Sequence, residues 1–326
     1  MQISKFSVAL LLGMVGISLT AFGQTDESIL LSPWEKGQTF EAKADGLAFP
    51  STKLGSDGGK LKLFESESSG RYRIDLGYDL NPTFGYDVTY LNLQQNHALP
   101  TGPRLPHQLT DFSLGFGSPI TKIGENGFIA FTAAAGYAGD ADLTDGRGVY
   151  AKGSFMYGYN LKKGTNLLLL IDYNGNRSFM PDVPLPAFAY SSRYDDKLAY
   201  VVGFPVSSVL WNPMEHVKVD LDWYIPDSFK VRAGWEIAKH IELFTAYNQR
   251  RDVFRTHDVP GDRRFFFREQ RAEVGVTYKA GGLRLEVAGG YALGRSFDQG
   301  FDARDLHRVA KLDDAPFVRF SLGFAR

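Results

Sequence analysis

Cysteine is absent from all 326 residues of the chain. Disulfide bonds, cysteine-based zinc sites and a thiol nucleophile are therefore excluded. An excess of charge of one sign is also absent, because 36 Lys and Arg residues face 37 Asp and Glu residues and the formal net charge is −1. The chain has neither a basic surface for nucleic acid nor an acidic tail, so no nucleic-acid partner is expected.

Long apolar runs are also missing beyond the N-terminus. A membrane-spanning helix needs about 20 apolar residues, and the nearest candidate, NLLLLI (166–171), has the length of a strand. At the N-terminus, Lys5 precedes an apolar run that ends in small residues just before Gln24. This pattern predicts a cleaved signal peptide over 1–23, with an N-terminal anchor helix as the alternative. If the rest of the chain crosses a membrane, it must therefore do so with β-strands.

Apolar and polar residues alternate strictly in many segments. In VKVDLDWY (217–224), the apolar Val217, Val219, Leu221 and Trp223 share one face of an extended strand. The same period of two recurs in RYRIDLGYDL (71–80), FKVRAGW (229–235), RAEVGVTY (271–278), LRLEVAGGY (283–291) and VRFSLGF (318–324). This repetition predicts an antiparallel sheet with one apolar face.

The pattern predicts about 14 strands, or 12 if the first two lie outside the sheet. They are expected near 58–67, 70–79, 83–93, 109–117, 126–137, 147–159, 164–174, 197–204, 215–224, 228–236, 240–249, 266–278, 282–292 and 316–325. Residues 24–57 are expected to be an irregular extension, either periplasmic or plugging the interior, and residues 58–326 to form the sheet domain.

The predicted connections differ in length on the two sides of the sheet. Long ones (94–108, 138–146, 176–196, 251–265 and 293–315) fall on one side, together with short hairpins near 68–69 and 225–227. Tight or moderate ones (80–82, 118–125, 160–163, 205–214, 237–239 and 279–281) fall on the other side. Aromatic residues occur on the apolar face near the strand ends at both sides: Tyr90, Tyr173, Trp223, Tyr247 and Tyr291, and Tyr159, Trp235, Tyr278 and Phe324. Segregated loops and two aromatic girdles are typical of a closed antiparallel transmembrane β-barrel in an outer membrane. Outer-membrane lipid and the barrel-assembly machinery are then the expected partners.

Four stretches resemble a family of bacterial outer-membrane β-barrel proteins that has no assigned activity. They are VVGFPVSSVLWNP (201–213), RRFFFREQRAEVGVTY (263–278), AGGYALGRSF (288–297) and APFVRFSLGF (315–324). The resemblance implies fold and location but no chemistry. One departure is that Phe324 is followed by Ala325 and Arg326, whereas such barrels usually end on an aromatic residue.

The polar face of the predicted strands carries charges of both signs, which would point into the barrel. The candidates are Arg71, Arg73, Asp75, Asp79, Asp87, Lys152, Asp172, Lys218, Asp220, Asp222, Lys230, Arg232, Glu242, Arg271, Glu273, Arg284, Glu286 and Arg319. One interpretation is a hydrated channel for small solutes whose charges set selectivity. The alternative is a structural or surface-interaction barrel whose interior is filled by ion pairs and whose long loops bind partners.

The loops carry no convincing catalytic or metal-binding set, so no enzyme activity and no cofactor are predicted. The proline-rich segment 179–190 is expected to be a stiff connection that either packs at the rim or folds inward. GDADLTDGRG (139–148) has aspartates but lacks the closing glutamate of a calcium loop. His257 and Asp258 are adjacent, and neighbours on an extended segment point in opposite directions.

Overall fold

The structure is a computed structural model that describes residues 30, 34, 37–55, 59–76, 81–95, 105–140, 146–162, 164–226, 228–257, 259 and 261–326. The predicted signal peptide over 1–23 lies outside these residues, as does Asp79. Among the residues described, no helix is both long and apolar enough to cross a membrane.

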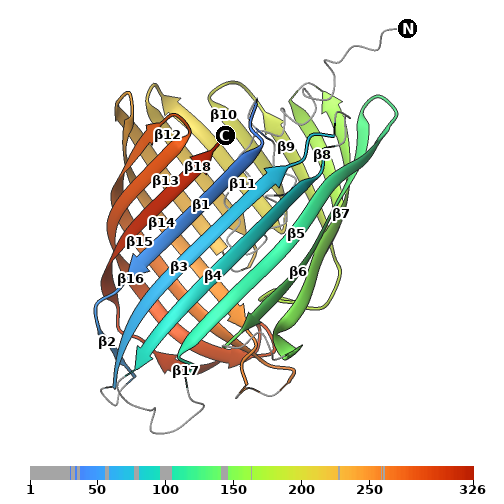
Figure 1. The fold of residues 1–326 in the computed structure, drawn as a ribbon. Coiled ribbons are helices and arrows are strands. Elements are labelled where there is room, and N and C mark those ends of the chain that lie inside the picture. The colour runs from blue at the N-terminus through green and yellow to red at the C-terminus, as the bar shows by residue number, and fades with distance from the viewer. Residues whose placement is uncertain are drawn as a thin grey trace.

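Strands dominate the described residues (Figure 1). They are β1 (Phe40–Ala48), β2 (Thr52–Leu54), β3 (Gly59–Arg73), β4 (Thr83–Gln95), β5 (Gln108–Ile123), β6 (Gly127–Gly139), β7 (Val149–Lys162), β8 (Thr165–Asn174), β9 (Leu185–Arg193), β10 (Leu198–Phe204), β11 (Val206–Met214), β12 (Val217–Tyr224), β13 (Ser228–Ala238), β14 (Ile241–Phe254), β15 (Arg264–Ala280), β16 (Leu283–Gly300), β17 (His307–Lys311) and β18 (Ala315–Ala325). A short 3-10 helix, η2 (Gly146–Gly148), precedes β7.

Sixteen of these strands form one closed antiparallel ring, and β2 and β17 lie outside it. The ring closes because β1 pairs with both β3 and β18, while β16 pairs with β18. The expected fold class was therefore right, but both strand counts, 14 and 12, were wrong. Closure leaves the ring without an unpaired edge, which is the condition for strands to cross a lipid bilayer.

The difference in strand count has four local origins. In place of the two strands predicted near 58–67 and 70–79, the structure has the single strand β3 from Gly59 to Arg73, with no hairpin at 68–69. The structure adds β1 to the barrel from within 24–57, the range that we expected to be irregular. It also adds β9 and β11, which the sequence pattern had assigned to the connections 176–196 and 205–214.

The apolar face of the strands points outward. On β12, Trp223 is 46% exposed on the outside, whereas Asp222 is buried on the inside. Other exposed outward residues include Tyr159, Trp235, Tyr278, Tyr291 and Phe324 of the predicted aromatic girdles. A belt of apolar and aromatic side chains on the outer surface suits a hydrocarbon environment.

The two ends of the barrel differ. At the end where the chain termini of the ring meet, the amide of Thr39 donates to the carbonyl oxygen of Arg326 over 2.7 Å. This termini end carries the connections 74–82, 124–126, 163–164, 194–197, 215–216, 239–240 and 281–282. The opposite, long-loop end carries 49–58, 96–107, 140–148, 175–184, 205, 225–227, 255–263 and 301–314, and with them β2 and β17 (Figure 1). Most long connections lie at the long-loop end, as predicted, but the one-residue connection at 205 also lies there and the nine-residue connection 74–82 lies at the termini end.

Candidate functional site: the charged interior and its crossing segment

Ion pairs line the interior wall near the termini end. We call this group the lower ion-pair cluster; it comprises Asp45, Arg232, Glu242, Glu273, Lys279, Arg284, Glu286 and Arg319. Alternation along β1, β13–β16 and β18 brings these side chains to one surface. Glu286 is nearly fully buried and accepts hydrogen bonds from Arg232, Arg284 and Arg319. Four acidic and four basic groups thus neutralise one another on the wall.

A second group, the upper ion-pair cluster, lies further along the same strands towards the long-loop end. It comprises Glu65, Glu67, Arg250, Asp252, Glu269, Arg271 and Arg295. Arg250 pairs with both Glu65 and Glu67, and Arg271 donates to Glu65 over 3.2 Å. The guanidinium of Arg295 is fully buried, 4.3 Å from the ring centroid of Phe49. Only Arg271 of this cluster was among the predicted interior residues.

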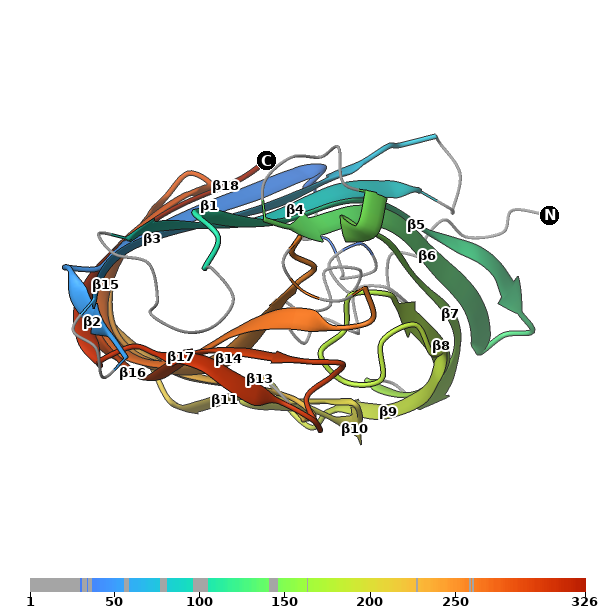
Figure 2. The ribbon, with the colours of Figure 1, turned by 90° about the horizontal axis from the view of Figure 1, so that it is seen from below.

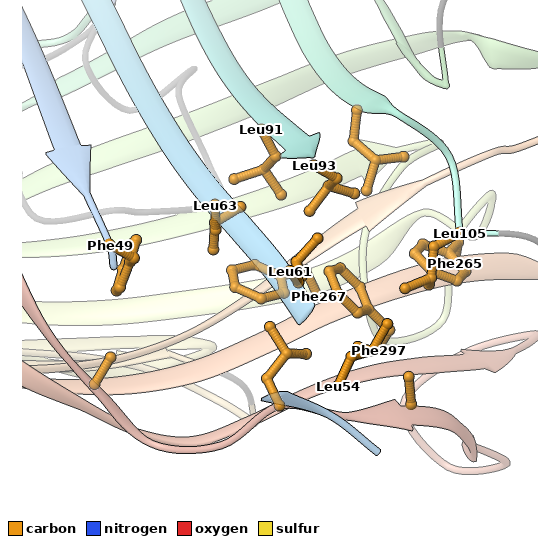
Figure 3. Close-up of a cluster of buried hydrophobic side chains, with 14 of the residues drawn as sticks. Phe49, Leu54, Leu61, Leu63, Leu91, Leu93, Leu105, Phe265, Phe267 and Phe297 are labelled. Atoms are coloured by element: carbon orange, nitrogen blue, oxygen red, sulfur yellow. The ribbon is translucent and has the colours of Figure 1, made fainter. Parts of the chain in front are cut away.

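An apolar cluster caps the upper ion-pair cluster at the long-loop end (Figure 3). Figure 3 shows Leu61 and Leu63 of β3 and Leu91 and Leu93 of β4 facing the phenylalanines of β15 and β16. Phe297 packs against the rings of Phe265 and Phe267 at 5.4 and 5.1 Å between centroids. These leucines and phenylalanines lie inside the barrel, so its interior is not polar throughout.

The end of β14 separates from β13 after Gln249 but stays paired with β15 up to Phe254, and the chain then crosses the interior. Figure 2, which looks into the long-loop end, shows β14 (orange) ending inside the outline of the barrel. The amide of Arg255 donates to the carbonyl oxygen of Ala138 at the end of β6 over 3.0 Å. Because β6 and β14 are separated by half of the ring, this segment connects opposite walls. We call residues 253–257 the crossing segment.

The connection 175–184 folds inward and binds the crossing segment. The guanidinium groups of Arg255 and Arg264 both donate to a carboxylate oxygen of Asp182, over 3.3 and 2.7 Å, and to the carbonyl oxygen of Gly175. The side-chain amide of Asn176 donates to the carbonyl oxygen of Val253. Of the two arrangements considered for the segment 179–190, inward folding applies to residues up to the start of β9.

Two described residues preceding β1 also lie inside the barrel. Leu30 is 5% exposed, and a side-chain carbon added at Gly85, Gly115 or Gly117 would lie within 2.9 Å of it. Trp34 stacks on the guanidinium of Arg71, whose central carbon is 4.0 Å from the ring centroid. The glycines of β4 and β5 therefore make room for Leu30 on the inner wall, and these contacts favour the plug interpretation at these two positions.

The predicted interior residues fall into separate groups. Arg232, Glu242, Glu273, Arg284, Glu286 and Arg319 meet in the lower ion-pair cluster, and Arg271 belongs to the upper one. Lys218 pairs with Asp220, Asp172 with Arg177, and Lys152 contacts Ser113. Arg71 pairs with Glu41; Arg73 ends β3; Asp87 lies on the inner face of β4; and Asp222 lies opposite Lys230. Asp75 lies beyond the end of β3, outside any strand.

Several interior residues were not predicted. Asp45 lies in β1 and Arg177 in the connection 175–184, both in stretches that the sequence pattern left irregular. Glu65 belongs to the predicted strand 58–67, and Arg250 follows directly after the predicted strand 240–249. Their alternation with outward residues such as Phe64 could have identified them. Arg295 lies within a register shift of β16, between Leu293 and Ser296, and therefore departs from the simple alternation.

The enzymatic and metal hypotheses gain no support from the described residues. The amide of His257 donates to Asp140, whose carboxylate also lies 3.6 Å from the imidazole. Asp258 and residues 141–145 of the calcium-like loop lie outside the described residues. Within the described part of the chain, no group of three or more potential metal ligands converges.

No protein-family model and no curated protein matches the sequence. Solved structures with a similar fold include the toluene transporter TodX of Pseudomonas putida, at 10% identity over 97% of both chains with a TM-score of 0.45. An outer membrane channel from Pseudomonas putida F1 aligns at 10% identity over 88% of this chain and 96% of its own, with a TM-score of 0.36. The translocator domain of the autotransporter NalP from Neisseria meningitidis aligns at 11% identity over 88% of both chains, with a TM-score of 0.30. The likeness concerns barrel architecture and establishes neither a solute nor a family.

Proposed function

We propose that this protein is a passive channel for small solutes in an outer membrane. The observation that carries the proposal is the closure of sixteen strands into one ring. Rings of about 8 strands are filled by their own side chains, whereas rings of about 16–18 strands have room for an aqueous channel. The crossing segment and the connection 175–184 narrow the long-loop end and would act as the constriction.

The outer surface supports the membrane location in this proposal. Its apolar and aromatic belt matches lipid, and the signal peptide expected over 1–23 would direct the chain across the inner membrane. The aromatic side chain of Phe324 points outward from β18, the strand that closes the ring with β1. This is the residue that we expect the barrel-assembly machinery to recognise.

A filled structural barrel is the second candidate. Two ion-pair clusters and the apolar cluster occupy the wall formed by β13–β16, β18, β1 and β3–β5, and the crossing segment reaches the opposite wall. In that case the buried pairs would hold the shape of the barrel and no solute would pass. Its long loops would then carry the interactions with partners.

Single-channel conductance distinguishes the two candidates. The mature chain, Gln24 to Arg326, is refolded in detergent and inserted into a planar lipid bilayer in potassium chloride. Folding of the barrel is verified by heat-modifiable gel migration. Stable current steps from this folded preparation support the channel. Absence of current from the same folded preparation overturns it and favours the filled barrel.

A further inference from the structure

We propose that the channel prefers small anionic solutes, such as inorganic anions and carboxylates, because four basic groups on β1, β12, β15 and β16 are accessible at its termini end while their acidic partners are more buried. This inference rests on the proposed channel function and adds the class of solute. It depends on which member of each ion pair faces the interior space.

Four ion pairs near the termini end share one orientation: the base is exposed and its acidic partner is buried. Side-chain exposure is 49% against 7% for Lys43 and Asp45, and 47% against 27% for Lys218 and Asp220. It is 42% against 8% for Lys279 and Glu242, and 43% against 3% for Arg284 and Glu286.

Strand register places the four bases on the inner face and close to one end. Lys279 is directly opposite Arg284 in the β15–β16 pair. Gly323 of β18 is opposite both Arg284 and Lys43, so no side chain separates these two bases at that position. Lys218 is the second residue of β12, which begins at the termini end.

A permeating ion would therefore approach the bases more closely than the acids. The energy of two charges falls with their separation, so the nearer member of a neutral pair determines the local potential. Screening strengthens this asymmetry, because the Debye length is about 8 Å at an ionic strength of about 0.15 M. The local potential therefore stabilises anions and destabilises cations at this end of the interior.

Three other ion pairs in the interior are oriented the other way. Glu67 is more exposed than Arg250, Asp182 more exposed than Arg264, and, near the termini end, Glu41 more exposed than Arg71. Arg71 is the base that Trp34 covers. On the interior wall, exposed bases with more buried acidic partners are thus concentrated on β1, β12, β15 and β16, and this location is what the experiment addresses. Glu236 of β13 is an exposed acid at the same end, and at the long-loop end Arg304 and Arg308 are more exposed than their partners Asp302 and Asp298.

The experiment is a reversal-potential measurement on the full mature protein in a planar bilayer with a potassium chloride gradient. The expected result is that chloride permeates at least about threefold more readily than potassium, as modest local potentials of this kind produce. The variant Lys218→Gln is expected to reduce this ratio and to remain folded, because its partner Asp220 is itself partly exposed. Lys62→Gln is the matched control, since Lys62 is an exposed, outward-facing residue of β3 at the long-loop end.

Each outcome has a distinct meaning. Chloride selectivity that falls in Lys218→Gln but not in Lys62→Gln supports the inference. Current without a preference for anions, or selectivity that both variants change equally, overturns the inference and leaves the channel function standing. Absence of current from a folded barrel overturns the channel function and the inference together.

Discussion

The backbone amide of Arg255 and the carbonyl oxygen of Ala138 form a hydrogen bond of 3.0 Å between opposite walls of the barrel. The other backbone pairings in the ring join neighbouring strands. This contact therefore constrains the interior in a way that the sheet alone does not. It is reinforced by Asp182, which binds the guanidinium groups of Arg255 and Arg264. The long-loop end therefore has a cross-connection that side-chain substitutions can weaken.

Asp182→Ala is expected to increase single-channel conductance. The substitution removes the carboxylate that both Arg255 and Arg264 bind and leaves, within the connection 175–184, only their hydrogen bonds to the carbonyl oxygen of Gly175, so this end would open more often. Asp262→Ala is the control, because Asp262 is an exposed acid in the same connection as the crossing segment. Equal conductance in the wild type and Asp182→Ala would show that the crossing segment does not limit flow.

Glu286→Gln is expected to destabilise the barrel by about 3 kcal/mol, since it removes one buried carboxylate charge from a network in which the guanidinium groups of Arg232 and Arg319 are largely buried. Arg232, Arg284 and Arg319 all depend on this carboxylate. Urea unfolding in lipid vesicles, followed by tryptophan fluorescence, measures the change. The exposed pair of Glu236 and His216 provides the control, and Glu236→Gln should cost less than about 1 kcal/mol.

Val287→Arg tests the lipid-facing surface. Val287 is 52% exposed on the outer face of β16, between Leu285 and Tyr291. A cation on the lipid face costs about 2–4 kcal/mol at the midplane and about 0–1 kcal/mol near the interface. The same change at Val149, the first residue of β7 at the long-loop end, should therefore be mild. Equal losses of unfolding free energy would contradict the assigned depth of these positions.

Leu30→Cys tests the plug interpretation. Because the chain has no cysteine, one introduced thiol is the only labelling site. Leu30 is buried against β4 and β5, so a water-soluble maleimide should label it much more slowly than Lys60→Cys on β3. Trp34→Ala, which removes the stacking on Arg71, is expected to accelerate labelling at position 30. Rapid labelling without this substitution would place Leu30 in water and contradict the plug.

The sequence predicted most of the barrel because alternation is strong wherever large outward residues are present. It failed for β1, whose outward residues after Phe40 are Ala42, Ala44, Gly46 and Ala48 and give almost no apolar signal. Conversely, Ser66 to Gly70 of β3 suggested a turn, although the strand continues through them. Where small residues occupy the outward positions, the sequence shows no alternation of apolar and polar residues, and the strand can be identified only from its pairing with neighbouring strands.

Proline caused the other two omissions. Pro186 of β9 lies beyond the last β9–β10 pair, where Phe188 faces Phe204, so its missing donor is tolerated there. Pro213 of β11 lies at a shift in the β11–β12 register between Trp211 and Met214. The charge clusters were predicted only in part, because alternation gives the direction of a side chain but not its partner on a strand distant in sequence.

The pairing of β1 with β18 also has a consequence for the order of assembly. These two strands are the most distant in sequence of all partners in the ring, so their contact forms only after every other strand has been delivered. Until then the backbone groups along the edge of β1 have no partner strand and are open to other chains. The lower ion-pair cluster also lacks the ion pair between Asp45 of β1 and Arg319 of β18. Insertion of the last strand therefore joins the wall and completes the electrostatic balance of the interior in a single event.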